Sequence, residues 1–172
     1  MVRFFRTHFL QYPRRVNVTI LAFTLLLGYS FGSIVSCFAS PILFQLMLTG
    51  AMNGVSIVSV LPILLFPFLI SALAVFLRLK WLLLLVAFLK AFLFSYLGSH
   101  IFRLFPTSGP LFAVLFLTSD LLSMPVLCWF WFRCISDSDS LVRALIPVFF
   151  LVFGIGLFDY LVTSPFLASL LS

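Results

Sequence analysis

The chain has 172 residues, of which 64% are hydrophobic and only 8% are charged. Soluble domains carry about 25% charged residues, so this composition excludes an ordinary soluble domain and indicates a membrane protein. A formal net charge of +6 would suggest a nucleic-acid partner in a soluble chain. Here the cations stand at the ends of apolar runs, where membrane topology explains them better. We therefore expect the lipid bilayer as the main partner and no nucleic acid.

Residues 1–15 form a short basic segment at the N-terminus. Phe5 and Phe9 recur at helical spacing, with Arg6 on another face. This pattern is typical of an amphipathic helix at the membrane interface. The remaining residues, 16–172, have no polar run long enough for a separate soluble domain. They are predicted to form a single transmembrane helical domain.

The first span is expected at residues 16–38, and it carries a small residue at every fourth position. Such a stripe lets two helix backbones approach closely. The stripe consists of Thr24, Gly28, Gly32 and Ser36. Packing within the chain is the preferred interpretation, and dimerisation through the stripe is the alternative.

A loop and a second span follow. Residues 39–54 are uncharged and interrupted by Pro41 and glycines, which indicates a loop that is either interfacial or re-entrant. The second span is expected at residues 55–77. Pro62 and Pro67 each remove a backbone donor there and should bend the helix.

The third span, residues 81–98, carries Lys90 near its middle. An ionised group at that depth costs a few kcal/mol, so we expect a partner of opposite charge on a neighbouring helix. The same span has a small face of its own, which consists of Ala87, Ala91, Ser95 and Gly98. His100 and Arg103 are expected in the loop after it.

Two further spans complete the chain. The fourth is expected at residues 111–132, with Asp120 near its centre, and the fifth at residues 141–162. Asp159 falls near the outer end of the fifth span, where water or Arg103 could reach it.

Lys90 and Asp120 are expected to form an intramembrane charge pair. They lie roughly 13 Å and 19 Å from the same end of two antiparallel neighbouring helices, and a lysine side chain can bridge the difference. We interpret the pair as a structural clamp, because one acid and one base cancel and no string of further ionisable groups forms a relay. Two alternatives are a polar cavity that binds a solute or carries protons, and an unpaired Lys90 that extends toward the interface.

The distribution of cations predicts the orientation. A five-span path leaves only Arg103 at one end and eight cations at the other. These are Arg3, Arg6, Arg14, Arg15, Arg78, Lys80, Arg133 and Arg143. The positive-inside rule then places the N-terminus inside and the C-terminus outside. The expected fold class is an all-α, polytopic membrane helical bundle of about five transmembrane helices.

Motifs of catalysis and metal binding are missing from the sequence. It contains no HExxH, no GxSxG and no P-loop, which are short motifs with known chemistry. Cys37, Cys128 and Cys134 lack the spacing of a zinc site or a disulfide framework. We therefore expect a non-enzymatic protein with no catalytic, cofactor or metal site.

Several features in combination resemble a known family. A basic N-terminal segment precedes GYSFGS at residues 28–33, the second span contains prolines, and the third reads FLKAF at residues 88–92. A short loop and a fourth span with a central polar residue and a proline follow. In this combination the chain resembles compact bacterial members of the stage II sporulation protein M family, which are polytopic membrane proteins.

This resemblance implies a non-enzymatic scaffold in a bacterial cell membrane. In the family, the role is to anchor cell-wall-remodelling partner proteins during engulfment of the forespore in sporulation. The residues themselves support an alternative, a small transporter or substrate-binding membrane subunit with a polar site near Lys90 and Asp120. Homo-oligomerisation is left open.

Overall fold

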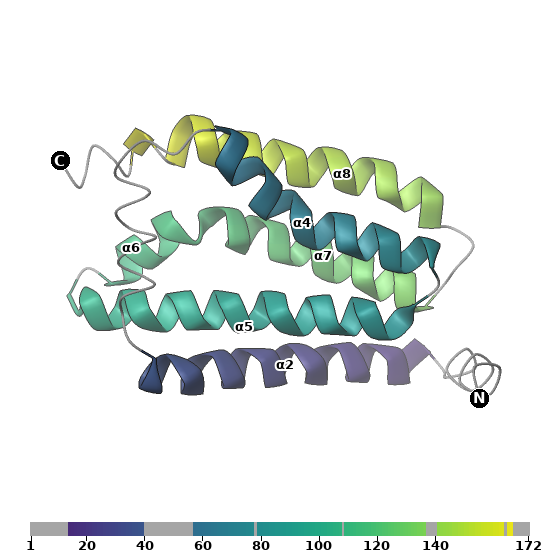
Figure 1. Ribbon diagram of the computed structural model, residues 1–172, viewed down its shortest axis with the longest axis horizontal. Coiled ribbons are helices and arrows are strands. Elements are labelled where there is room, and N and C mark those ends of the chain that lie inside the picture. The colour runs from purple at the N-terminus through teal and green to yellow at the C-terminus, as the bar shows by residue number, and fades with distance from the viewer. Residues whose placement is uncertain are drawn as a thin grey trace.

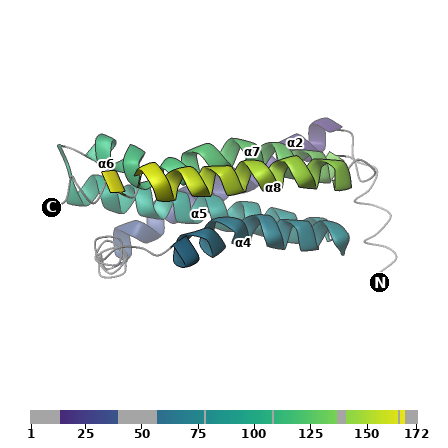
Figure 2. The same cartoon turned by 90° about the horizontal axis from the view of Figure 1, so that it is seen from above.

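The computed structural model describes residues 14–39, 57–77, 79–107, 109–136, 141–163 and 165–166. Within these ranges every regular element is a helix, and the long helices lie side by side in one bundle (Figure 1, Figure 2). The elements are α2 (Arg14–Phe38), α4 (Ile57–Phe76), α5 (Lys80–Leu104), α6 (Gly109–Phe116), α7 (Thr118–Ser136), α8 (Leu141–Phe158) and the π-helical turn η1 (Asp159–Thr163). The all-α helical bundle predicted from the sequence is confirmed. The amphipathic segment and the 39–54 loop lie almost wholly outside the described residues.

Three of the helices are long and apolar enough to cross a bilayer. They cover Val16–Phe38, Lys80–Leu104 and Ala144–Thr163. Their outward faces are covered by large apolar side chains, such as Phe38, which is 87% exposed, and Phe150, which is 66% exposed. Contiguous apolar surface of this extent suits hydrocarbon rather than water. These helices therefore indicate a membrane protein.

The chain passes up and down the bundle (Figure 1). Helices α2, α5 and α8 run in one direction, and α4 and the α6–α7 pair run in the other. The start of α2, the end of α4, the start of α5, the end of α7 and the start of α8 all lie at one end. This is the hairpin path that the sequence predicts, and it brings α5 and α7 into contact as antiparallel neighbours.

The loop expected at His100 and Arg103 is wrong, because α5 continues to Leu104. Gly98 does not end the helix, since it is buried and packs against the Leu117 side chain at 3.5 Å from an ideal Cβ position. The helix stops just before Pro106, which disfavours helical geometry in the residue that precedes it.

The fourth span is also not a single regular helix. It divides into α6 and α7 at Leu117. Backbone bonds still cross the division, with the Leu121 amide donating to the Leu117 carbonyl at 2.7 Å. The Thr118 hydroxyl donates to the carbonyl of Val114, one turn earlier, and such bonds back to the preceding turn often bend helices. As a result Asp120 lies in the first turn of α7 rather than in mid-helix.

Helix α4 is joined to α7 by a buried tryptophan. The Trp131 indole donates a hydrogen bond to the Ser71 hydroxyl at 2.8 Å, and that hydroxyl donates to the Pro67 carbonyl at 2.6 Å. Both Trp131 and Ser71 are fully buried. The chain of bonds satisfies the indole N–H and keeps the polar atoms paired inside an apolar core. Pro67 lies inside α4, which changes direction along its length (Figure 1).

Helix α2 packs very closely on α5. A Cβ added at Gly28 would lie 2.5 Å from the Phe88 carbonyl oxygen, and one added at Gly32 would lie still closer to that of Phe92. Only glycine lets the two backbones approach to this distance. The small stripe of the first span therefore packs within the chain, which is the preferred of its two interpretations.

The α5 side of this contact is the small face expected from the sequence. Its residues are almost completely buried: Ala87 is 0% exposed, Ala91 2% and Ser95 3%. The Ser33 and Ser95 hydroxyls lie 2.6 Å apart and share a hydrogen bond across the contact. Small residues with an interhelical hydrogen bond are the usual basis of helix association in membranes. We call this contact the α2–α5 seam.

We expect Gly32→Ala to destabilise the protein by about 1–3 kcal/mol, because the added methyl group overpacks the seam against backbone atoms that have no room to move. The measurement is the unfolding transition of the detergent-solubilised protein, followed by circular dichroism. Gly154→Ala is the matched control, since nothing lies within 4 Å of its Cβ position. Equal effects of the two substitutions would contradict the close seam.

Candidate functional site

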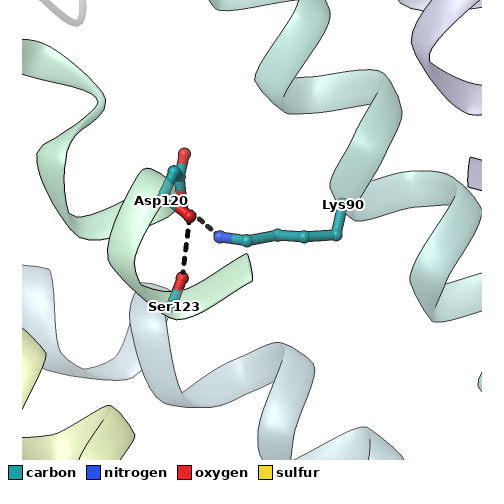
Figure 3. Close-up of polar contacts among 3 residues, drawn as sticks. All are labelled: Lys90, Asp120 and Ser123. Carbon is teal, nitrogen blue, oxygen red and sulfur yellow. Dashed lines mark hydrogen bonds and ion pairs between the residues drawn. The ribbon is translucent and has the colours of Figure 1, made fainter. Parts of the chain in front are cut away.

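The structure brings Lys90 and Asp120 together. Figure 3 shows the Lys90 side chain extended from α5 toward α7, with its ammonium group against the Asp120 carboxylate. The Lys90 Nζ donates a hydrogen bond to Asp120 Oδ1. The pair therefore links two helices that are adjacent and antiparallel, as the positions of the two residues in their spans predict.

The pair is largely shielded from solvent by the protein. The Lys90 side chain is 10% exposed and that of Asp120 is 20% exposed. Removing two charges from water costs several kcal/mol for each ion, and their attraction offsets this only when the geometry is good. The direct contact of ammonium and carboxylate meets that condition. Truncating one partner would leave the other buried and uncompensated.

Ser123 adds a polar group one turn beyond Asp120 (Figure 3). Its hydroxyl donates to the Asp120 backbone carbonyl at 3.3 Å, and the residue is 1% exposed. The bond satisfies a buried hydroxyl without competing for the carboxylate. The Asp120 side chain thus remains available to the lysine.

Asp159 belongs to the same polar region, which corrects the sequence expectation. The hydroxyls of Ser119 and Thr163 hydrogen-bond its side chain, and Asp120 lies within electrostatic range. Asp159 is the first residue of η1, directly after α8, and this turn packs against α7. The charge pair therefore has a second carboxyl group as a neighbour, whereas the sequence suggested water or Arg103 as the group that reaches Asp159.

Arg103, the partner suggested for Asp159, is engaged elsewhere. Its guanidinium donates to the Ser36 carbonyl at 2.6 Å, near the C-terminal end of α2. A cation at the C-terminal end of a helix satisfies a free carbonyl and complements the helix dipole. Arg103 therefore ties α5 to α2 at the end of the seam.

Two cations make contacts at the opposite end of the bundle, and one of these contacts joins two helices. The Lys80 ammonium donates to the Ile135 carbonyl at 2.8 Å, in the last turn of α7. The Arg133 guanidinium lies 5.3 Å from the centre of the Trp129 ring, which is a cation–π contact. Both cations lie at the end where α2 begins (Figure 1).

Helix α5 is the element that connects the predicted site residues. Its small face contacts α2 in the seam, and Lys90 reaches α7. The polar groups around the pair are hydroxyls and carboxyls. In the ranges that the structure describes, no group of three or more His, Cys, Asp or Glu side chains is arranged to hold a metal ion.

Comparison with known proteins identifies no relative of this chain. No family model matches the chain, and neither curated proteins nor solved structures give a match. The function must therefore be argued from the residues and their geometry.

Sequence reasoning missed the grouping of Ser119, Asp159 and Thr163. The available clue is that Asp120 and Asp159 each lie in the outer half of an expected span, on helices joined by a short connection. Their distance from the shared connection is similar, about 17 and 18 residues from Asp137 and Leu141 respectively. That count would have placed the two acids at the same depth.

We expect Lys90→Met to lower the folded yield and to destabilise the bundle by about 3–5 kcal/mol, because it leaves the Asp120 carboxylate without its partner. Adding Asp120→Leu should restore part of the loss, since the unpaired acid is then removed. The measurement is the monodisperse fraction in gel filtration, together with the unfolding transition. Full wild-type yield from Lys90→Met alone would rule out a structural clamp.

Proposed function

We propose that this protein is a multi-pass membrane protein of the bacterial cell membrane with five spans, formed by α2, α4, α5, the α6–α7 pair and α8. Its N-terminus lies inside and its C-terminus outside. The distribution of charge supports this orientation: Lys80 and Arg133 lie at the end where α2 begins, and Arg103 lies at the other. Positively charged residues are enriched on the cytoplasmic side of membrane proteins.

Within that membrane we propose a non-enzymatic scaffold, which holds cell-wall-remodelling or other membrane proteins in place. The observation that carries this proposal is the direct contact between the Lys90 ammonium and the Asp120 carboxylate. The intramembrane cation is used to join α5 to α7 inside the bundle. A rigid core of this kind leaves the outer helix faces and loops as the surfaces for partners. The resemblance to the stage II sporulation protein M family points to the same role and extends it to sporulation.

One observation favours a second candidate, a small transporter or substrate-binding membrane subunit. Asp159 adds a second carboxyl group beside the pair, and intramembrane ionisable groups often mark the path of an ion or solute. A transporter needs a cavity of roughly a few hundred Å³ with convergent polar groups. Binding of a small solute to the purified protein, lost in a Lys90→Met variant that still folds, would favour this candidate over the scaffold.

The orientation can be tested by cysteine labelling. In a background in which Cys37, Cys128 and Cys134 are replaced by alanine, we expect Thr107→Cys to react with a membrane-impermeant maleimide in intact cells. Leu77→Cys should react only after the membrane is permeabilised, because the connection between α4 and α5 then faces the cytoplasm. The reverse pattern would invert the orientation, and labelling of both or neither in intact cells would contradict five spans.

The scaffold role can be tested by photo-crosslinking in native membranes. A photoreactive phenylalanine analogue is introduced at exposed positions on different helices, and at one buried control. The positions are Phe31, Phe66 and Phe150, with Phe130, which is 0% exposed, as the control. A scaffold should give a discrete protein adduct from one exposed helix face and none from Phe130. Adducts with lipid alone at every exposed position would refute stable partners on those faces.

A further inference from the structure

The polar region around the charge pair contains more acid than base. The ammonium of Lys90 contacts Asp120, and Asp159 lies within electrostatic range of that same carboxylate. The hydroxyls that bond Asp159 are themselves buried, with Ser119 8% and Thr163 6% exposed. Two carboxyl groups are therefore grouped near one ammonium, which contacts Asp120, in a partly buried region.

Full ionisation of these three groups would leave one uncompensated negative charge. A buried charge without a partner is costly, and two carboxyl groups that share a site do not readily ionise together. Lys90 is in direct contact with Asp120, so Asp120 is the acid whose charge is stabilised. In the part of the chain that the structure describes, the groups that act on Asp159 are the Ser119 and Thr163 hydroxyls and the Asp120 carboxylate. Asp159 is the group that needs a bound positive charge.

We propose that Asp159 is a proton-binding site, in which the Asp159 carboxyl carries a proton while the Lys90–Asp120 pair stays ionised. A proton needs a single carboxyl oxygen, whereas a hard metal cation needs several oxygen ligands converging on it. The side chains that face Asp159 are Ser119 and Asp120 from α7 and Thr163 from its own turn, with Lys90 of α5 reaching the site through Asp120. This set is small for a cation and sufficient for a neutral acid.

The local backbone suits exchange of that proton. Asp159 and Thr163 are the first and last residues of the π-helical turn η1, four positions apart. Such wide turns are rare and occur often at functional sites. Asp159 itself is only partly buried and lies at the end of its candidate span. The proton can therefore reach the aqueous phase at that end of the bundle.

A hydrophobic carbodiimide provides the test, because it reacts with protonated carboxyl groups in apolar surroundings and leaves a stable N-acylurea adduct. The full chain, purified in detergent, is labelled at a series of pH values, and the adduct is located by peptide mass spectrometry. We expect the adduct on Asp159 and not on Asp120, with labelling that falls as the pH rises and the carboxyl ionises. Labelling on Asp120 instead, or no labelling of Asp159 at any pH, would overturn the proposal.

Two variants sharpen the result. Asp159→Asn should abolish the adduct. Asp120→Asn should also reduce labelling of Asp159 severalfold, because Lys90 is then free to neutralise the one remaining carboxylate; unchanged labelling would contradict the shared-ammonium argument. Each variant is first checked for helicity and monodispersity, and the wild-type pH series decides the question if a variant does not fold.

The same assay separates a proton from a metal cation. Addition of sodium ions at constant pH and ionic strength should leave the labelling rate unchanged. Protection of Asp159 by sodium but not by choline would assign the site to a cation and overturn the proton assignment. The result does not depend on the scaffold role, because the label reports on the carboxyl group and not on a partner protein.

Discussion

The structure depends on the need to neutralise a lysine inside an apolar helix. In a bilayer core, the cost of an ionised group is a few kcal/mol or more, and no water is present to reduce it. Lys90 meets that cost by contact with Asp120, and the contact is made only when α5 and α7 are neighbours in one register. A single electrostatic requirement thus selects one helix pairing among several that apolar packing would allow.

The second requirement is close packing without a hydrophobic driving force between helices. Lipid tails are as apolar as leucine, so helices in a membrane associate through van der Waals contact and polar bonds. The α2–α5 seam uses both, with glycine against backbone along its length and the Ser33–Ser95 bond across it. Arg103 closes the seam at one end by bonding the Ser36 carbonyl. Helix α5 is consequently held on one side by shape and on another by charge.

Much of this arrangement is readable from the sequence, because it follows from composition and spacing. The apolar runs, the four-residue stripe with Gly28 and Gly32, and the depths of Lys90 and Asp120 each reflect a local pattern. The exact ends of the helices, and the division of the fourth span into two helices, could not be predicted from composition and spacing. The division at Leu117 is accompanied by a threonine bond to the preceding turn, and α5 continues past Gly98, which packs against Leu117. Such features depend on which helix lies opposite.

The position of Asp159 shows how one tertiary contact changes the charge balance around an ion pair. An isolated Lys90–Asp120 pair is electrically complete, and its simplest role is to hold two helices together. With Asp159 beside it, the same pair becomes part of a three-group system whose charge depends on bound protons. Because α5, α7 and η1 each contribute one ionisable group, a change of protonation alters the attraction among three elements at once. In the protonation state proposed above, a neutral Asp159 avoids the repulsion between two neighbouring carboxylates, which full ionisation would introduce between η1 and α7.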